Sequence, residues 1–264
     1  MKDPRFIEAC KADGQKIERL IRRFYSQQAR RRVFVDGGAH HGYHTSYARQ
    51  FFTDAVIAIE ASPKTFVEHL NRQRSMSVEG GACLEIPLNV ALGNRARQGD
   101  TIEFFFSEEH PGRSTVNSKI WDTWSKGAVR YEAPIQTAVF EIDDCKDYLT
   151  QGATIDFIKL DLEGNEVAAL RGGLRTLKED RPNIVMEFGL KPSNEAEYGE
   201  SLDGFRQFLA EMGYRAIAPW GDDVTDSMVA GYPFWYVFLL PQGASFDANL
   251  TLLKASYDAS LAET

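Results

Sequence analysis

The sequence predicts an α/β protein built around a mostly parallel sheet. From residue 33 onward, short apolar runs alternate with amphipathic stretches, which is typical of βαβ units. The first run, 33–36, leads into a glycine-rich segment, and the second, 55–60, ends in the acid Glu60. A strand, a glycine turn, a helix and a second strand with a terminal acid form the layout of a nucleoside site at the carboxyl end of a sheet.

In the first part of the chain the expected elements alternate between strand and helix. Apolar runs predict strands, and apolar residues at helical spacing predict helices. The elements, beginning with a strand, are 33–36, 43–52, 55–60, 63–73 and 84–92. Pro63 falls in the first turn of its helix, a position that proline favours.

The alternation breaks between about 94 and 140. Residues 101–107 and 135–140 are expected strands, and the stretch between them is rich in Gly, Pro, Ser and Trp. This composition predicts an insertion or lid. Trp121 and Trp124 within it either stack on an acceptor or anchor the insertion to the core.

The alternation then resumes and completes the sheet. The expected elements, again beginning with a strand, are 156–161, 166–177, 183–187, 202–212 and 214–218. Gly213 is expected to terminate the helix over 202–212. The continuous apolar run 235–240 suits a last buried strand.

Length and composition favour one elaborated domain, because 264 residues with 43% apolar content can bury one sizeable core. We divide the chain into a basic helical N-terminal extension (1–32), a main domain (33–241) and a helical C-terminal tail (242–264). The three cysteines are widely spaced without a CxxC pair, so neither a disulfide framework nor a cysteine zinc site is expected. No run approaches the roughly 18 apolar residues of a membrane span, and the N-terminus lacks the pattern of a signal peptide. We therefore expect a soluble, cytoplasmic protein.

Charge is distributed unevenly. Residues 1–32 carry ten Lys or Arg against four Asp or Glu. Because the net charge of the whole chain is −8, the remaining residues carry a net charge of about −14. The basic segment either contacts nucleic acid or an anionic surface, or is the solvated face of a helix that packs on the body. We favour the second interpretation, with the packing face formed by Ile17, Leu20, Ile21 and Phe24. The acidic remainder argues against a nucleic-acid substrate.

The glycine-rich segment has features of a nucleoside pocket. Gly38 and Gly42 allow backbone conformations and a close approach to ligand that a β-carbon would block. Asp36 can accept hydrogen bonds from turn amides and from the ammonium of a zwitterionic ligand, and Glu60 from both ribose hydroxyls. In the dinucleotide pattern G-x-G-x-x-G, read from Gly38, the third position is His40 instead of glycine. This departure disfavours a pyrophosphate and favours a ligand without phosphates, such as S-adenosylmethionine.

A second group of charges surrounds the expected strand 156–161. Lys159 lies inside the strand and is expected to pair with a carboxylate, because an unpaired buried charge is costly. Asp161 and Glu187 end neighbouring strands at the edge where ligands of open α/β sheets bind. Glu163 and Glu166 either act there or complement the start of the next helix. A metal site of Asp161, Glu187 and one of His40, His41 or His44 is an alternative, but the spacing supports no metal and we expect none.

At these residues the chain resembles the FkbM family of S-adenosylmethionine-dependent methyltransferases. The family pattern runs roughly D-V-G-A-N-x-G-x-x-[ST], F-E-P, N-x-A-L, T-L-D, I-K-x-D-x-E-G-x-E and a late strand ending in E. The corresponding segments here are Asp36-Gly37-Gly38-Ala39-His40-His41-Gly42-Tyr43-His44-Thr45, Ile59-Glu60-Ala61-Ser62-Pro63, Asn89-Val90-Ala91-Leu92, Glu141-Ile142-Asp143, Ile158-Lys159-Leu160-Asp161-Leu162-Glu163-Gly164-Asn165-Glu166 and Ile184-Val185-Met186-Glu187. The departures are His40 in place of Asn, Gly37 in place of an aliphatic residue, and one extra residue before Pro63.

The resemblance implies a Rossmann-like class I methyltransferase fold: a seven-stranded, mostly parallel sheet with a reversed last strand, here with an inserted β or lid segment. It implies S-adenosyl-L-methionine as cofactor and methyl transfer to a hydroxyl oxygen of a small molecule, commonly a sugar or other secondary metabolite. On this basis the expected cofactor-binding residues are Asp36, Gly37, Gly38, Ala39, His40, Gly42, Thr45, Glu60, Ala61, Ser62, Asn89, Val90, Ala91 and Asp161.

Methyl transfer from a sulfonium is an in-line displacement, which depends on alignment and on a site that excludes water. A positioned base helps because an alcohol is a poor nucleophile at neutral pH. Our candidates are Asp161 first, then His41 or His44, and Glu187. Two other functions stay open: an NAD(P)-dependent Rossmann oxidoreductase and a non-catalytic cofactor-binding protein. We expect no nucleic-acid partner and no membrane span, and a homo-oligomer is compatible with the sequence.

Overall fold

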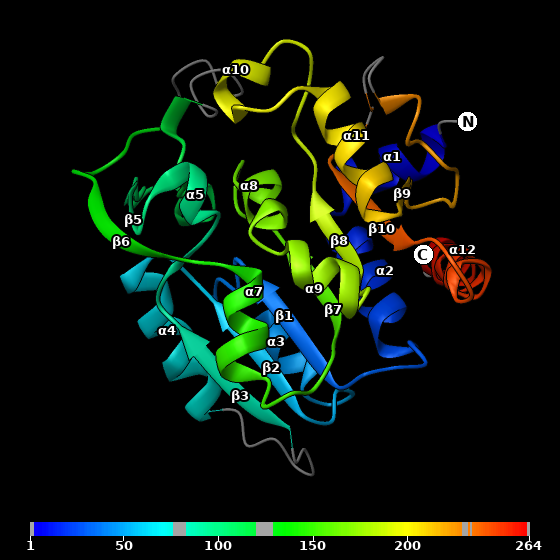
Figure 1. The fold of residues 1–264 in the computed structure, drawn as a ribbon, viewed down its shortest axis with the longest axis horizontal. Coiled ribbons are helices and arrows are strands. Elements are labelled where there is room, and N and C mark those ends of the chain that lie inside the picture. The colour runs from blue at the N-terminus through cyan, green and yellow to red at the C-terminus, as the bar shows by residue number, and fades with distance from the viewer. Residues whose placement is uncertain (1–2, 76–82, 120–128, 229–231, 233, 263–264) are drawn as a thin grey trace.

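The computed structural model describes residues 3–75, 83–119, 129–228, 232 and 234–262. Its centre is a seven-stranded sheet in the order β3-β2-β1-β7-β8-β10-β9 (Figure 1). The strands are β1 Val33–Gly37, β2 Ala55–Ile59, β3 Leu84–Leu88, β7 Ile155–Leu160, β8 Asn183–Glu187, β9 Tyr214–Ile217 and β10 Tyr236–Pro241. Only β10 runs antiparallel to its neighbours within this sheet. The expected mostly parallel sheet with a reversed last strand is confirmed.

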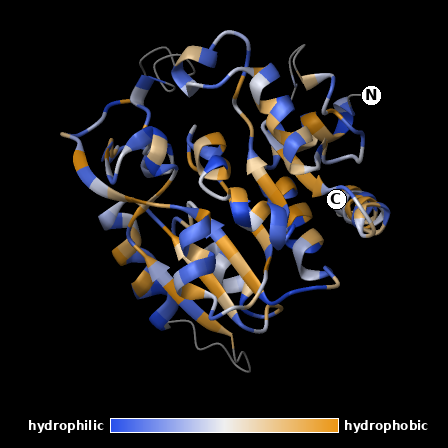
Figure 2. Ribbon diagram, in the orientation of Figure 1, coloured by the Kyte–Doolittle hydropathy of each residue, from blue (hydrophilic) through white to orange (hydrophobic). Residues whose placement is uncertain are grey.

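Helices cover both faces of the sheet. The chain moves along the sheet in one direction after β1 and in the other after β7, so right-handed crossovers place the two sets of connecting helices on opposite faces. One set is α3 (Tyr43–Ala48) and α4 (Pro63–Ser75), and the other is α8 (Glu166–Arg171), α9 (Leu174–Glu179), α10 (Glu195–Tyr198) and α11 (Leu202–Met212). Hydrophobic residues run along the central strands between these layers (Figure 2).

The two ends of the chain pack together on one side of the molecule (Figure 1). They form α1 (Pro4–Ala12), α2 (Gln15–Ser26) and α12 (Phe246–Ala262). The Phe24 ring of α2 lies edge-on to Phe157 and Phe238 of the sheet. The Tyr257 hydroxyl of α12 donates a hydrogen bond to Asp3, which caps α1. The basic N-terminal segment is therefore anchored to the body through its apolar face.

A second, three-stranded sheet is inserted between β3 and β7. Its order is β4-β6-β5, from Ala91–Leu92, Ile135–Phe140 and Thr101–Phe104. The short helical segments around it are α5 (Arg95–Gln98), η1 (Pro111–Arg113), α7 (Ile142–Asp144) and η2 (Cys145–Leu149). Trp121 and Trp124 lie outside the described residues.

Three expected elements differ in the structure. The run 84–92 is not one strand: β3 ends at Leu88, and the next two paired residues belong to the second sheet. The side chain of Asn89 donates to two carbonyl oxygens of the loop after β2 and so turns the chain there. The helix expected over 166–177 is interrupted at Gly172 and Gly173, so that α8 ends at Arg171 and α9 begins at Leu174. The Gly172 backbone passes so close to Gly93 that a β-carbon on Gly172 would lie 2.1 Å from the Gly93 carbonyl oxygen. The helix expected to reach residue 52 ends at Ala48.

No helix in the described part of the chain is both long enough and apolar enough to cross a membrane.

Candidate active site

The sheet has its switch point between β1 and β7, where open α/β sheets bind ligands at the carboxyl ends of the strands. The loops after these two strands touch there. Gly38 has φ +72°, and a β-carbon on it would lie 1.8 Å from the Asp161 carbonyl oxygen. Both the backbone conformation and the close approach therefore require glycine at this position.

A buried ion pair between Asp36 of β1 and Lys159 of β7 joins the two strands at the same switch point. Asp36 on β1 is fully buried; its Oδ2 accepts a hydrogen bond from the Thr45 hydroxyl at 2.7 Å, and its Oδ1 lies 3.5 Å from Lys159 Nζ. Lys159 Nζ also donates to the Gly38 carbonyl at 2.8 Å and lies 3.8 Å from Asp161. Burial lowers the pKa of Lys159, but the carboxylates of Asp36 and Asp161 raise it more, so the ammonium stays charged. Asp36 thus orients Lys159, which in turn binds the backbone of the glycine loop.

Glu60 follows β2 and is bound by two backbone amides. The Ser62 amide donates to Oε1 at 2.8 Å, and the His40 amide donates to Oε2 at 2.9 Å. Burial raises the pKa of Glu60, although these two amide hydrogen bonds act in the opposite direction. Each carboxylate oxygen keeps a second lone pair, so the side chain can still accept from two hydroxyls of a ribose.

A cavity of about 620 Å³ opens above these loops. The expected site residues that line it are Gly38, Ala39, His40, His44, Glu60, Ala61, Val90, Ala91 and Asp161. The other expected site residues are not among those that line it: Asp36, Gly37, His41, Gly42, Thr45, Ser62, Asn89 and Glu187. The cavity size is typical of a small-molecule site, for which about 300 to 1,000 Å³ is common.

The segment expected as an insertion or lid lines the cavity, and so does helix α2, which the sequence did not place there. Helix α2 with its N-cap contributes Gly14, Gln15, Glu18 and Arg22, and the inserted segment contributes Phe104, Pro111, Gly112, Ser114 and Val116. Local patterns carry no signal for the α2 contacts, because this helix reaches the cavity only through the tertiary fold. The i, i+4 spacing of Glu18 and Arg22 was visible, but it reads as a solvated helix face.

The three histidines of the glycine segment have different surroundings. His40 has φ +49°, and burial, together with the charges of His41 and Lys159, lowers its pKa to about 4. His41 Nδ1 lies 3.4 Å from Glu68. His44 is buried, and its Nε2 is hydrogen-bonded to Glu18. His40 is therefore a neutral ring at physiological pH.

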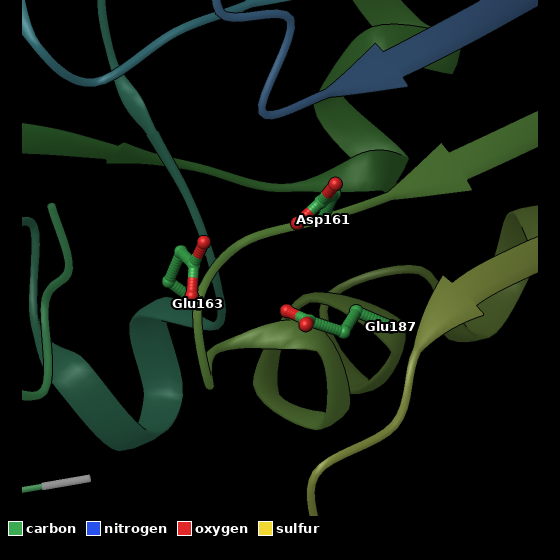
Figure 3. Close-up of side chains that lie close together, drawn as sticks. All are labelled: Asp161, Glu163 and Glu187. Carbon is green, nitrogen blue, oxygen red and sulfur yellow. The ribbon is translucent and has the colours of Figure 1, made fainter. Parts of the chain in front are cut away.

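Three carboxylates meet at the carboxyl edge of β7 and β8. One oxygen from each of Asp161, Glu163 and Glu187 lies within 4.8 Å of the other two, and the three side chains point toward one another (Figure 3). Asp161 Oδ2 accepts a hydrogen bond from the Tyr236 hydroxyl at 2.9 Å. Burial raises the pKa of both glutamates well above their usual range, and the charge of Asp161 raises it further. The cluster therefore favours bound protons, or a cation, over three full negative charges.

The loop that carries Glu163 is held from two sides. Glu166 accepts hydrogen bonds from the amides of Leu162 at 2.7 Å and Gly164 at 3.3 Å. The Thr115 hydroxyl of the inserted segment donates to the Glu163 carbonyl at 2.7 Å. The inserted segment is thus joined directly to the acidic cluster and covers one side of the cavity.

This geometry agrees with a comparison of the sequence with known families. The model of the methyltransferase FkbM domain matches residues 36–216. The chain belongs to the FkbM methyltransferase family. The match begins at Asp36 and spans the glycine loop, Glu60 and the acidic cluster. The FkbM resemblance seen in the motifs is confirmed.

Solved structures similar to this FkbM domain are distant in sequence. Methyltransferase FkbM from Methylobacillus flagellatus is 16% identical, with a TM-score of 0.46 over 80% of this chain and 43% of that one. The present chain thus spans less than half of that protein. The O-methyltransferase from Bacillus cereus in complex with SAH is 12% identical, with a TM-score of 0.42 over 87% and 80% of the two chains. Ribosomal protein L11 methylase from Lactobacillus delbrueckii is 10% identical, with a TM-score of 0.44 over 87% and 79%. No curated protein matches the chain significantly.

Proposed function

We propose that this FkbM-family chain is an S-adenosylmethionine-dependent O-methyltransferase that acts on a hydroxyl of a small molecule, such as a sugar or other secondary metabolite. The observation that carries the proposal is a single cavity with two unlike ends. One end presents Glu60, suited to a ribose, and the other presents the carboxylates of Asp161 and Glu163. A nucleoside cofactor and a hydroxyl acceptor would meet between them.

The residues present fit the cofactor. Glu60 can accept from both ribose hydroxyls. Val90 and Ala91 also line the cavity and follow Asn89, which donates to the Glu60 carbonyl, so they suit contact with the adenine ring. Gly38 lets the β1 and β7 loops approach each other closely, and both loops line the cavity. When bound, the cofactor supplies an electrophilic methyl group on a sulfonium sulfur. The protein's task is then to bind, align and exclude water.

The acidic end of the cavity can take the proton of the acceptor hydroxyl. Asp161 accepts a hydrogen bond from the Tyr236 hydroxyl and lies 3.8 Å from Lys159, so its carboxylate is already engaged. Glu163 also lines the cavity, and because burial raises its pKa, its carboxylate is the stronger base once it has released its proton. Glu187 belongs to the same carboxylate cluster but does not line the cavity. We assign proton removal to Glu163 and alignment of the acceptor to Asp161.

The first test is cofactor binding. S-adenosylhomocysteine is expected to raise the melting temperature of the purified protein, because a ligand that binds only the folded state stabilises it, by about 2.7 kcal/mol at 100 times its dissociation constant. NAD is expected to leave the melting temperature unchanged. Stabilisation by NAD and not by S-adenosylhomocysteine would overturn the proposal and favour an oxidoreductase.

The second test is turnover. Release of S-adenosylhomocysteine should be measured across a panel of sugar and polyketide hydroxyls, with and without a chelator. Glu163→Gln is expected to keep cofactor binding and to lower kcat by about 10²- to 10⁴-fold, the usual contribution of a positioned base. The exposed Glu211→Gln serves as the matched control. An unchanged kcat in Glu163→Gln would remove Glu163 from the reaction.

A further inference from the structure

Helix α2 places a carboxylate and a guanidinium on the wall of the cavity. Glu18 and Arg22 are four residues apart, so they lie one above the other on the same helix face. Both line the cavity beside the β1 loop. The remaining question is what ligand such a pair of opposite charges would bind.

Glu18 is held in place and stays ionised. Its Oε2 is hydrogen-bonded to His44 Nε2, which ties α2 to the start of α3. Burial raises the pKa of Glu18, but the hydrogen bond and charge of His44 lower it more, and the net shift is downward. Its second carboxylate oxygen makes no hydrogen bond within the described residues. That oxygen is available to a cationic donor.

Arg22 is oriented but not neutralised. Its Nε donates to the Glu18 carbonyl at 3.3 Å, and its guanidinium lies over the Tyr47 ring, 5.5 Å from the centroid. In the described part of the chain its two terminal amino groups donate to no carboxylate. Two adjacent donors of this kind suit a bidentate contact with a carboxylate.

The other charges near the β1 loop are already engaged. Lys159 contacts the Gly38 carbonyl, Asp36 and Asp161. Asp36 is fully buried and lies outside the cavity wall, so it is not placed to receive a ligand ammonium. Among the described residues, the charged partners available to a zwitterionic ligand at this end of the cavity are therefore Glu18 and Arg22 of α2.

We propose that α2 is an amino-acid clamp: Arg22 binds the carboxylate, and Glu18 the ammonium, of the methionine end of the cofactor. The clamp rests on the proposed function, because it presumes a nucleoside ligand with an amino-acid tail. It makes the N-terminal segment part of the cofactor site instead of a separate appendage. It also replaces Asp36 as the partner of the ligand ammonium.

Binding measurements with trimmed ligands test the clamp. By calorimetry, Arg22→Gln is expected to weaken S-adenosylhomocysteine binding by about 10- to 100-fold, as for loss of a charge-assisted bidentate contact. Binding of 5′-methylthioadenosine, which lacks the amino-acid tail, should change less than twofold. Arg23→Gln, which removes the same charge one residue away and outside the cavity wall, should bind both ligands as the wild type does.

Two further analogues separate the two contacts. The decarboxylated analogue of S-adenosylhomocysteine should bind wild type and Arg22→Gln equally, and the deaminated analogue should bind wild type and Glu18→Gln equally. If Arg22→Gln weakened the binding of 5′-methylthioadenosine and of S-adenosylhomocysteine equally, the clamp would be overturned, since this result would indicate a damaged cavity. Unchanged S-adenosylhomocysteine binding in Arg22→Gln would overturn the clamp alone. A wild type that binds neither ligand would overturn the proposed function and the clamp with it.

Discussion

A β-carbon on Gly38 would lie 1.8 Å from the carbonyl oxygen of Asp161, so the two halves of the sheet are in close backbone contact at the switch point. Gly38 begins the loop after β1, and Asp161 begins the loop after β7. The Asp161 amide also donates to the Gly37 carbonyl at 3.1 Å. The cofactor end and the acidic end of the cavity are therefore held in register by backbone contacts.

Gly38→Ala is expected to destabilise the protein by at least ~2 kcal/mol, because alanine is strained at φ +72° and its methyl group has no room. Urea unfolding measures the loss. Gly112→Ala is the matched control, since a β-carbon at Gly112 meets no atom within 4 Å. A Gly38→Ala variant as stable as Gly112→Ala would mean that the two loops are not in contact in solution.

Lys159→Met is expected to cost about 3–5 kcal/mol, because it leaves the fully buried Asp36 carboxylate without its counter-charge. The double variant Asp36→Asn/Lys159→Met removes both charges and should lose less than the sum of the two single variants. Unfolding free energies of all four proteins form the cycle. Strict additivity would show that Lys159 and Asp36 do not interact.

Much of the fold was predictable because it rests on local patterns. Helix α11, Leu202–Met212, has the expected bounds, because Ser201 caps it and Gly213 adopts φ +68° at its end. The break between α8 and α9 was not predictable, because it lies where the backbone closely approaches Gly93, far away in the sequence. Patterns report what a segment prefers; they do not report which distant backbone it must avoid.

The candidate site, like the fold, contains residues that the sequence could predict and residues that it could not. Glu60 and Asp161 were recognisable, because each ends a strand of a parallel sheet and such ends converge. Glu18 and Arg22 were not, because nothing local indicates that α2 lies over the β1 loop. Asp36 shows the converse: its position was predictable, but the Thr45 and Lys159 partners that occupy it depend on the packing of α3 and β7.

Glu187→Gln is expected to stabilise the protein more at pH 8.5 than at pH 5. Burial raises the pKa of Glu187, and the charges of Asp161 and Glu163 raise it further. Above about pH 4.5 the folded chain therefore holds a proton that the unfolded chain has lost, and stability falls as the pH rises. An amide cannot ionise, so the variant avoids this loss. Urea unfolding from pH 5 to 8.5 measures the difference in slope.

Two comparisons make the Glu187 result interpretable. The exposed Glu211→Gln should keep the wild-type pH slope. Carboxylate oxygens are also the ligands that Mg²⁺ prefers, so the series is repeated with Mg²⁺. If Mg²⁺ stabilises the wild type at pH 8.5 but not Glu187→Gln, a cation and not a proton relieves the repulsion in the cluster. Parallel slopes for wild type and Glu187→Gln under both conditions would contradict the prediction.

His40→Asn is expected to flatten the acid side of the stability profile. Burial lowers the pKa of His40 to about 4, while the unfolded histidine titrates near 6.5. Between these values the unfolded chain binds more protons, so stability rises with pH and is lost as the pH falls toward 4. Asparagine does not titrate and tolerates the φ of +49°. Unfolding free energies from pH 7.5 to 4.5 should therefore fall less in His40→Asn than in wild type or the exposed His110→Asn control. Equal slopes in all three would show that folding does not shift the pKa of His40.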